Sequence, residues 1–170
     1  MADIIIYAAG NPDLYPIEYY DRDTESYVGI IPEMLKEFSR EHGYEFSYYR
    51  ADEGDMREEL GMNHQVDIIS GCIEGEDIGN FDEAGGYTSV QLFSSVEDGQ
   101  TRVYEVYVTD AAPEGLAEEL SGFAAEYSAE KQLGTVVTAA SGGKADYADM
   151  TPYLGIAGGL ILILAVLLAV

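Results

Sequence analysis

The stretch that decides the fold is residues 29–50, GIIPEMLKEFSREHGYEFSYYR. Its first half predicts a helix, because Pro32 suits a first helical turn and the larger inward positions recur on one face: Ile31, Leu35, Phe38 and His42. Gly43 predicts the end of that helix. The residues after it alternate aromatic and polar side chains, which is typical of a strand. The stretch therefore predicts a helix that leads directly into a strand.

The segments on either side extend this pattern. Residues 3–8 (DIIIYA) and 66–70 (VDIIS) are short apolar runs that predict buried strands. Between them, residues 55–62 predict a short helix with Met56 and Leu60 turned inward. The order strand, helix, strand, helix, strand favours a parallel α/β sheet with right-handed crossovers.

The other segments are less regular. Residues 9–28 are rich in Gly, Pro, Asp and Tyr and predict a long surface loop, and residues 72–86 predict an acidic, irregular one. Residues 87–96 and 102–109 predict a hairpin around Asp98-Gly99. A second long helix is expected from Pro113 to about Leu133, with one inward face: Leu116, Leu120, Phe123 and Tyr127. Residues 134–152 read as a linker, with room for a short strand at its start.

Composition excludes several classes of protein. With 47% hydrophobic residues in 170, the chain is too apolar to be disordered. Eight basic residues against 32 acidic ones give a net charge of −24, which excludes a nucleic-acid partner. Adaptation to strong salt would also account for this charge. The single cysteine, Cys72, cannot form an internal disulfide, so it is either a semi-buried thiol or the site of an intermolecular bridge.

The last 18 residues, 153–170, carry no charge and end in GGLILILAVLLAV. This length is at the lower edge of what crosses a hydrocarbon core, and a buried helix of a soluble domain would show a polar stripe. We therefore expect a transmembrane helix, with a buried helix as the alternative. The GxxxG pair Gly155 and Gly159 would let two such helices form a homodimer.

The residues before this segment indicate its orientation. Eight acidic residues and only two lysines lie in residues 110–150. Because cytoplasmic flanks favour Lys and Arg, we expect this flank, and the folded domain with it, to be extracellular or periplasmic. No signal peptide precedes the first strand and no basic sequence follows Val170. The expectation is a truncated fragment of a longer protein.

Three stretches in order resemble a known family: LYPIEYYD (14–21), YVGIIPEMLKEFSREHGYEFSYY (27–49) and VDIISG (66–71). They are similar to the first lobe of periplasmic solute-binding proteins of the amino-acid-binding type. The segment YEVYV (104–108) running into APEGL (112–116) looks like the return of that family's chain to its first lobe. Only 32 residues, 72–103, stand where the family inserts its second lobe. The resemblance implies an α/β single lobe over residues 1–133, in which the hairpin replaces lobe 2.

The resemblance also implies where a ligand would bind. In the family it lies over the carboxyl ends of the strands. Carried over by position, the ligand-binding residues are Asn11, Asp13, Leu14 or Tyr15, Glu18, Ser70, Gly71 and Cys72. The family has an aromatic residue that stacks on the ligand, and it stands shortly before the unit that corresponds to Pro16-Ile17-Glu18. Counting back from that unit reaches Leu14 in this sequence, and a shift of one residue would reach Tyr15 instead. The family's carboxylate-clamping arginine is absent, because residues 72–77 read CIEGED.

These observations predict a non-enzymatic, membrane-anchored solute-binding or sensor module without a cofactor. Its expected partner is a cationic or neutral solute, rather than a typical free amino acid, or a protein. The alternative is an interaction or dimerisation module that has lost small-molecule binding. The acidic loop 72–86 reads as a solvated surface, not a Ca²⁺ site, because its spacing does not follow an EF-hand. His42 and His64 lack catalytic partners at motif spacing, so no catalytic or metal-binding residue is expected.

Overall fold

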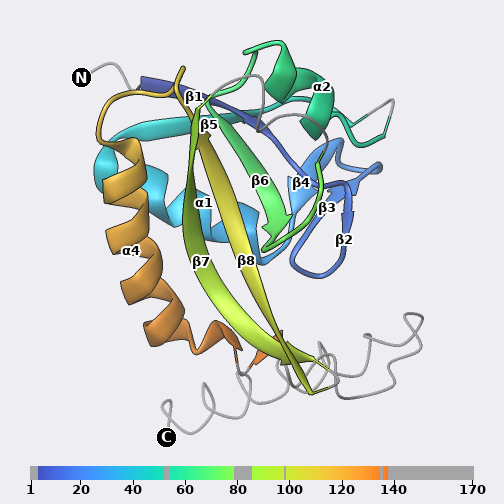
Figure 1. Ribbon diagram of the computed structural model, residues 1–170, viewed down its shortest axis with the longest axis vertical. Coiled ribbons are helices and arrows are strands. Elements are labelled where there is room, and N and C mark those ends of the chain that lie inside the picture. Colours follow the sequence, from blue (N-terminus) through green and yellow to red (C-terminus); the bar gives the residue numbers. More distant parts are fainter. Residues whose placement is uncertain (1–3, 52–53, 79–85, 98, 135, 138–170) are drawn as a thin grey trace, which may run out of the picture.

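The structure, a computed structural model, describes residues 4–51, 54–78, 86–97, 99–134 and 136–137. Its centre is a five-stranded sheet (Figure 1). In spatial order the strands are β5 (Tyr44–Tyr48), β1 (Ile4–Ala9), β6 (Ile68–Ile73), β8 (Gln100–Thr109) and β7 (Tyr87–Glu97). The three strands predicted from the short apolar and alternating runs are all present, and so is the hairpin around residues 98–99.

The expectation of a mostly parallel sheet is wrong, because the sheet is mixed. β1 pairs in parallel with β5 and with β6, as the alternation of strands and helices predicted. β8 then pairs antiparallel with both β6 and β7. The reason is that the hairpin joins the lobe's own sheet, and a tight hairpin turn can only connect antiparallel strands.

Helices α1 (Ile30–His42) and α4 (Leu116–Lys131) cover one face of this sheet. Figure 1 shows α1 crossing behind the strands and α4 running along β7. Three members of the predicted stripe of α1 are confirmed, since Ile31, Leu35 and Phe38 are buried in the main core. The fourth, His42, is exposed and stacks on the Phe38 ring. Leu116 and Leu120 of α4 meet the three buried residues in that core. The periodicity that predicted both helices therefore also identified their buried faces.

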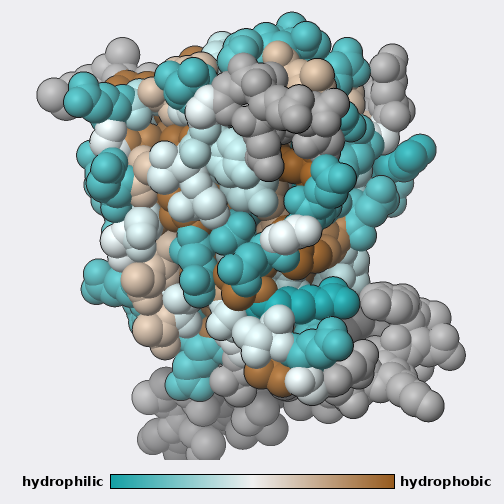
Figure 2. Space-filling model, in the orientation of Figure 1, coloured by the Kyte–Doolittle hydropathy of each residue, from teal (hydrophilic) through white to brown (hydrophobic). Residues whose placement is uncertain are grey.

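The opposite face carries the short helix α2 (Arg57–Met62) and a smaller apolar cluster. Leu60 packs there against the strand residues Ala9, Ile69, Cys72 and Tyr107. Figure 2 shows that on the visible side of the molecule the hydrophobic areas are small and separated by hydrophilic ones. The second face is therefore only locally apolar, over α2 and its neighbours.

Residues 9–28 do not form the predicted irregular loop. They fold into a small antiparallel sheet, β2-β3-β4, made of β2 (Asp13–Leu14), β3 (Glu18–Asp21) and β4 (Ser26–Val28). Cross-strand aromatic pairs hold it, with Tyr20 opposite Tyr27 at a ring separation of 5.3 Å. The strands have two to four residues, too few for an alternating pattern to be recognised. This small sheet supplies Glu18 to the candidate site.

The packed core continues beyond α4. Leu133 and Val137 are both buried in it, and the described residues 133, 134, 136 and 137 are helical, not a strand. Gly134 lies against Ser94 of β7, near the end of the sheet toward which β6 runs. The predicted linker beyond residue 137, the predicted membrane span 153–170 and the glycine pair within it lie outside the described residues. No helix within the described ranges is long and apolar enough to cross a membrane.

Candidate functional site

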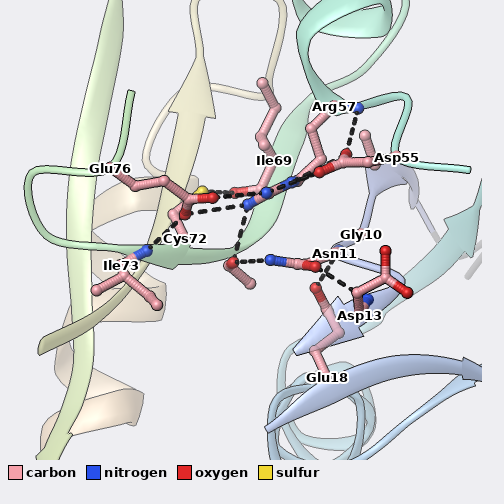
Figure 3. A network of polar contacts seen from close by, with 12 residues as sticks. Gly10, Asn11, Asp13, Glu18, Asp55, Arg57, Ile69, Cys72, Ile73 and Glu76 are labelled. Carbon is pink, nitrogen blue, oxygen red and sulfur yellow. Dashed lines mark hydrogen bonds and ion pairs between the residues drawn. The ribbon is translucent and has the colours of Figure 1, made fainter. Parts of the chain in front are cut away.

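The carboxyl ends of β1 and β6 bring together four of the residues implied by the family resemblance (Figure 3). Asn11 follows β1, while Ser70 and Gly71 lie in β6. The amide Nδ2 of Asn11 donates to the carbonyl of Gly71 at 3.0 Å. Glu18 reaches the same point from β3 of the small sheet. The site therefore joins the two sheets at the edge where the fold was expected to bind a ligand.

The Glu18 carboxylate is fully buried and accepts three hydrogen bonds. The backbone N–H of Asn11 donates to Oε2 at 2.7 Å. The hydroxyls of Ser70 and Tyr48 donate to Oε1 at 2.7 and 3.0 Å. These donors come from three segments of the chain, so Glu18 ties the small sheet to β1, β5 and β6.

Burial raises the pKa of Glu18 from 4.5 to about 7. The hydrogen bonds from Asn11, Ser70 and Tyr48 oppose this shift, and so does the positive charge of Arg57, but burial prevails. The same burial raises the pKa of Tyr48, and the neighbouring Glu18 charge adds to that rise. Glu18 therefore changes its charge near neutral pH, inside a group of otherwise uncharged partners.

Replacing Glu18 by glutamine is expected to remove one component of the pH dependence of stability. In the folded chain Glu18 holds its proton up to about pH 7, whereas the unfolded chain releases it near 4.5. Its contribution is thus fully present below about pH 4.5 and is lost as the pH rises through 7. Urea unfolding should show that the wild type loses about 3 kcal/mol more than Glu18→Gln between pH 4.5 and 8.5.

The control for this measurement is Glu59→Gln, which neutralises an exposed carboxylate on α2. That variant should follow the wild-type pH profile, because it leaves the buried Glu18 and its donors unchanged. Parallel profiles for the wild type and Glu18→Gln would contradict the assignment and mean that Glu18 stays ionised across this range.

A second polar group lies beside the first and is centred on Arg57, which is only 4% exposed. Its guanidinium Nε and Nη2 contact both carboxylate oxygens of Asp55 at 2.8–3.1 Å. Nη1 and Nη2 contact Glu76 at 3.3 and 2.7 Å. Nη1 also donates to the Gly71 carbonyl at 2.9 Å. Burial alone would lower the pKa of Arg57, but the two carboxylates hold it above its ordinary value.

Arg57 brings a guanidinium to this edge of the sheet that the sequence did not reveal there. It arrives from α2 instead of the segment after Gly71, and residues 72–77 supply the acid Glu76 that pairs with it. The carboxylates of Asp55 and Glu76 pair with the N–H groups of the Arg57 guanidinium from two sides. These are the donors that the carboxylate of a solute would use. The arrangement therefore offers no open clamp for the carboxylate of a solute.

The remaining residues implied by the resemblance lie in different surroundings. Asp13 joins the group through its backbone N–H, which donates to Asn11 Oδ1 at 3.0 Å, and its carboxylate is exposed. Leu14 packs partly against the main core, whereas Tyr15 is 40% exposed and lies 4.9 Å from the Tyr19 ring. Cys72 is buried in the smaller apolar cluster, and burial raises the pKa of its thiol.

Four residues of these groups were not singled out as site residues from the sequence: Tyr48, Asp55, Arg57 and Glu76. Tyr48 stands on the aromatic side of the alternating pattern after Gly43, which indicates a packed strand residue and not a site residue. Arg57 follows the inward Met56 directly, so the helical pattern placed it beside the buried face without indicating burial. A usable signal was the pair Asp55 and Arg57 at the start of a predicted helix, where the Asp55 side chain accepts from the Arg57 backbone N–H at 3.0 Å.

The fold is shared with solved solute-binding proteins. The arginine-bound form of domain 1 from TmArgBP superimposes with a TM-score of 0.53 and 19% identity, over 72% of this chain and 92% of that one. An ancestral cationic amino acid solute binding protein gives a TM-score of 0.53 and 8% identity, over 81% and 95%. A periplasmic binding protein of Salmonella typhimurium with high arginine specificity gives 0.50 and 8%, over 74% and 94%. No protein-family model and no curated protein matches the sequence. The fold of the described residues is therefore that of one lobe of a solute-binding protein.

Proposed function

We propose that the chain is an extracytoplasmic, membrane-anchored module that binds a small solute and is not an enzyme. The observation that carries this proposal is the convergence of Asn11, Ser70 and Gly71 at the carboxyl ends of β1 and β6. Open α/β sheets bind ligands at this edge. The similar structures described above include proteins whose names state that they bind arginine or cationic amino acids.

The charges at this edge support a cationic solute. Arg57 is already paired with Asp55 and Glu76, so two negative charges face its one positive charge. Asp13 and Asp77 add exposed acidic residues around the same edge. A guanidinium or ammonium group would be attracted here, whereas an α-carboxylate would meet repulsion. The proposed solute is therefore a small organic cation that does not depend on a carboxylate for binding.

Agmatine and arginine test this proposal directly, because agmatine has the guanidinium of arginine but lacks its carboxylate. Calorimetry with the complete chain should show agmatine binding at least as tightly as arginine, and glutamate not binding. Asp13→Asn should weaken agmatine binding about fivefold, since it removes one exposed charge at the site. Glu126→Gln removes a charge from the exposed side of α4 and is the matched control.

Two outcomes would count against the proposal. A flat response to agmatine, putrescine, spermidine, arginine and neutral sugars would contradict a solute-binding role. Much tighter binding of arginine than agmatine would contradict the cationic, carboxylate-independent ligand class while leaving the binding module in place.

The membrane anchor is tested separately by deleting residues 153–170. The complete chain is expected to partition with membranes and to require detergent for extraction, because the deleted segment is uncharged. The shortened chain should appear in the aqueous fraction with the same cooperative unfolding. Membrane association that persists without residues 153–170 would contradict the anchor.

The second candidate is an interaction or dimerisation module, and one observation favours it. Large apolar side chains of β1 are exposed: Ile4 by 51%, Ile5 by 48% and Tyr7 by 45%. Neighbouring exposed apolar side chains often mark an interface. Light scattering over a hundredfold range of concentration distinguishes the candidates, because a dimer that is lost in Ile5→Lys would favour self-association through β1.

A further inference from the structure

The main sheet ends in two edge strands, β5 and β7, and they differ in how they are protected. Edge strands expose unpaired main-chain groups, which proteins usually cover or distort. β7 is distorted by a register shift between Gln91 and Phe93. It is also covered, since Gly134 lies so close that a Cβ there would be 2.4 Å from the Ser94 carbonyl oxygen. The β7 edge is therefore irregular at Gln91–Phe93 and covered at Ser94.

The β5 edge has neither protection. Its register with β1 is unbroken from Tyr44 to Tyr48, and no described strand lies beyond it. The Gly43 carbonyl and the Tyr49 N–H both bond to β1. Because main-chain groups alternate along a strand, the N–H and C=O groups of Tyr44, Phe46 and Tyr48 point away from β1.

Two adjoining hollows, with volumes of about 550 and 340 Å³, run along this outward edge. Both are lined by Ser26 and Tyr27 of β4 and by Phe46 and Tyr48 of β5, and the larger hollow is lined also by α1 between Pro32 and Ser39. β4 is itself the edge strand of the small sheet. We call the two hollows together the β4–β5 groove. It follows a strand of five residues, about 16 Å long.

The β4–β5 groove is lined by aromatic rings and by polar groups that could bind the main chain of a peptide. Aromatic rings flank the outward main-chain groups, with Tyr27 and Tyr48 stacked at 4.8 Å. Tyr20 lines the smaller hollow, and its hydroxyl is buried without a hydrogen-bond partner among the described residues. Buried hydroxyls are nearly always paired. A polar main chain in the groove would provide a partner of the kind this hydroxyl lacks.

Charge favours one occupant over another. The lining contains three carboxylates and two cations, and each cation is paired with a carboxylate: Lys36 with Glu33 and Arg50 with Glu25. Glu45 leaves the lining net negative. A second copy of this chain would bring another net charge of −24 to the same edge, and the two copies would repel each other. A basic partner would be attracted.

We propose that the β4–β5 groove accepts a short basic peptide in extended conformation, which adds a strand to the main sheet beside β5. The main-chain groups of Tyr44, Phe46 and Tyr48 bind its backbone, and Tyr27 and Tyr48 contact its side chains. Strand addition is an established mode of peptide recognition. This site shares Tyr48 with the Glu18 group, but its outward main-chain groups lie at the outer edge of the sheet, apart from Asn11 and Gly71. The proposal does not depend on the proposed solute-binding function.

The test uses the complete chain and the capped peptide KVTVKVTVK, followed by fluorescence anisotropy and amide hydrogen exchange. Binding should slow exchange at the amides of Tyr44, Phe46 and Tyr48 by at least about tenfold. The amides of Glu45 and Ser47 already face β1 and should change little. Glu45→Lys should weaken binding about fivefold, whereas Glu41→Lys, the same change at an exposed position of α1 outside the groove, should not.

Two matched peptides complete the design. The same peptide N-methylated at every residue should not bind, because neither edge of its backbone can then donate to β5, and EVTVEVTVE should bind at least about tenfold more weakly. Binding without slowed exchange at the three amides would overturn the proposal. Slow exchange of these amides in the chain without peptide would also overturn the proposal. Protection that increases with protein concentration would identify a second copy of the chain as the occupant. Protection that does not change with concentration would identify another part of the same chain.

Discussion

Replacing Gly71 by alanine is expected to lower the free energy of unfolding by about 4 kcal/mol. Gly71 has φ +64, and a Cβ at this position would lie 2.3 Å from Glu18 Oε2 and 2.5 Å from Asn11 Cβ. The new methyl group would therefore enter the centre of the candidate site. Because Glu18 is held by three donors from three segments, it cannot move aside without breaking hydrogen bonds.

Gly75→Ala is the matched control for this variant. Gly75 also has positive φ, at +78, but a Cβ there would have no neighbour within 4 Å. The strained backbone conformation should therefore be the main cost of Gly75→Ala, which should lower the free energy of unfolding by about 1 kcal/mol. Urea unfolding of both variants separates the two contributions. Equal losses at the two positions would mean that the close approach of Glu18 and Asn11 to Gly71 has no energetic weight.

Replacing Arg57 by methionine is expected to lower the free energy of unfolding by about 4 kcal/mol. Methionine keeps much of the side-chain volume but removes the charge that faces Asp55 and Glu76. The two carboxylates would then face each other across a partly buried space, and the Gly71 carbonyl would lose one of its donors. Removing one member of a buried ion pair is more damaging than removing the whole pair, because the partners are left uncompensated.

The control is Arg40→Met, which breaks a single exposed pair with Glu37 on α1 and should change stability by less than about 0.5 kcal/mol. Adding Asp55→Asn and Glu76→Gln to Arg57→Met should recover part of the loss, because the repulsion is then gone. Thermal and urea unfolding measure all four chains. A small loss in Arg57→Met, or no recovery in the triple variant, would mean that the buried pairs contribute little.

Much of the fold could be predicted from the sequence because its signals were local. The α1 stripe, the apolar runs of β1 and β6, and the turn at residues 98–99 each depend on neighbouring residues. The small sheet was missed for the opposite reason. Its strands are stabilised by pairs such as Tyr20 with Tyr27, which form only once a turn has folded, and the Asp21 side chain closes that turn by accepting from the Asp23 N–H.

The candidate site was predictable to the same limited degree. The resemblance to a solute-binding lobe named Asn11, Glu18, Ser70 and Gly71, and the structure places these four in contact with one another. Their predicted role in ligand binding stays a prediction. The resemblance gave no sign of the Arg57 group, since Glu76 is 19 residues away in the chain and meets Arg57 only across the end of β6. Charge partners at such separation follow from packing and leave no periodic trace in the sequence.

The position of Gly134 against Ser94 affects how the site would be presented at a cell surface. Ser94 pairs with Val103, next to the register of Ile73 and Tyr104, so the chain leaves the domain at the same end of the sheet as Gly71. Under the anchor proposed above at residues 153–170, 15 residues separate it from the last described residue, and a chain of 15 residues spans at most about 50 Å. If the proposed anchor and solute site both hold, that reach would keep the site within the layer of fluid next to the lipid headgroups.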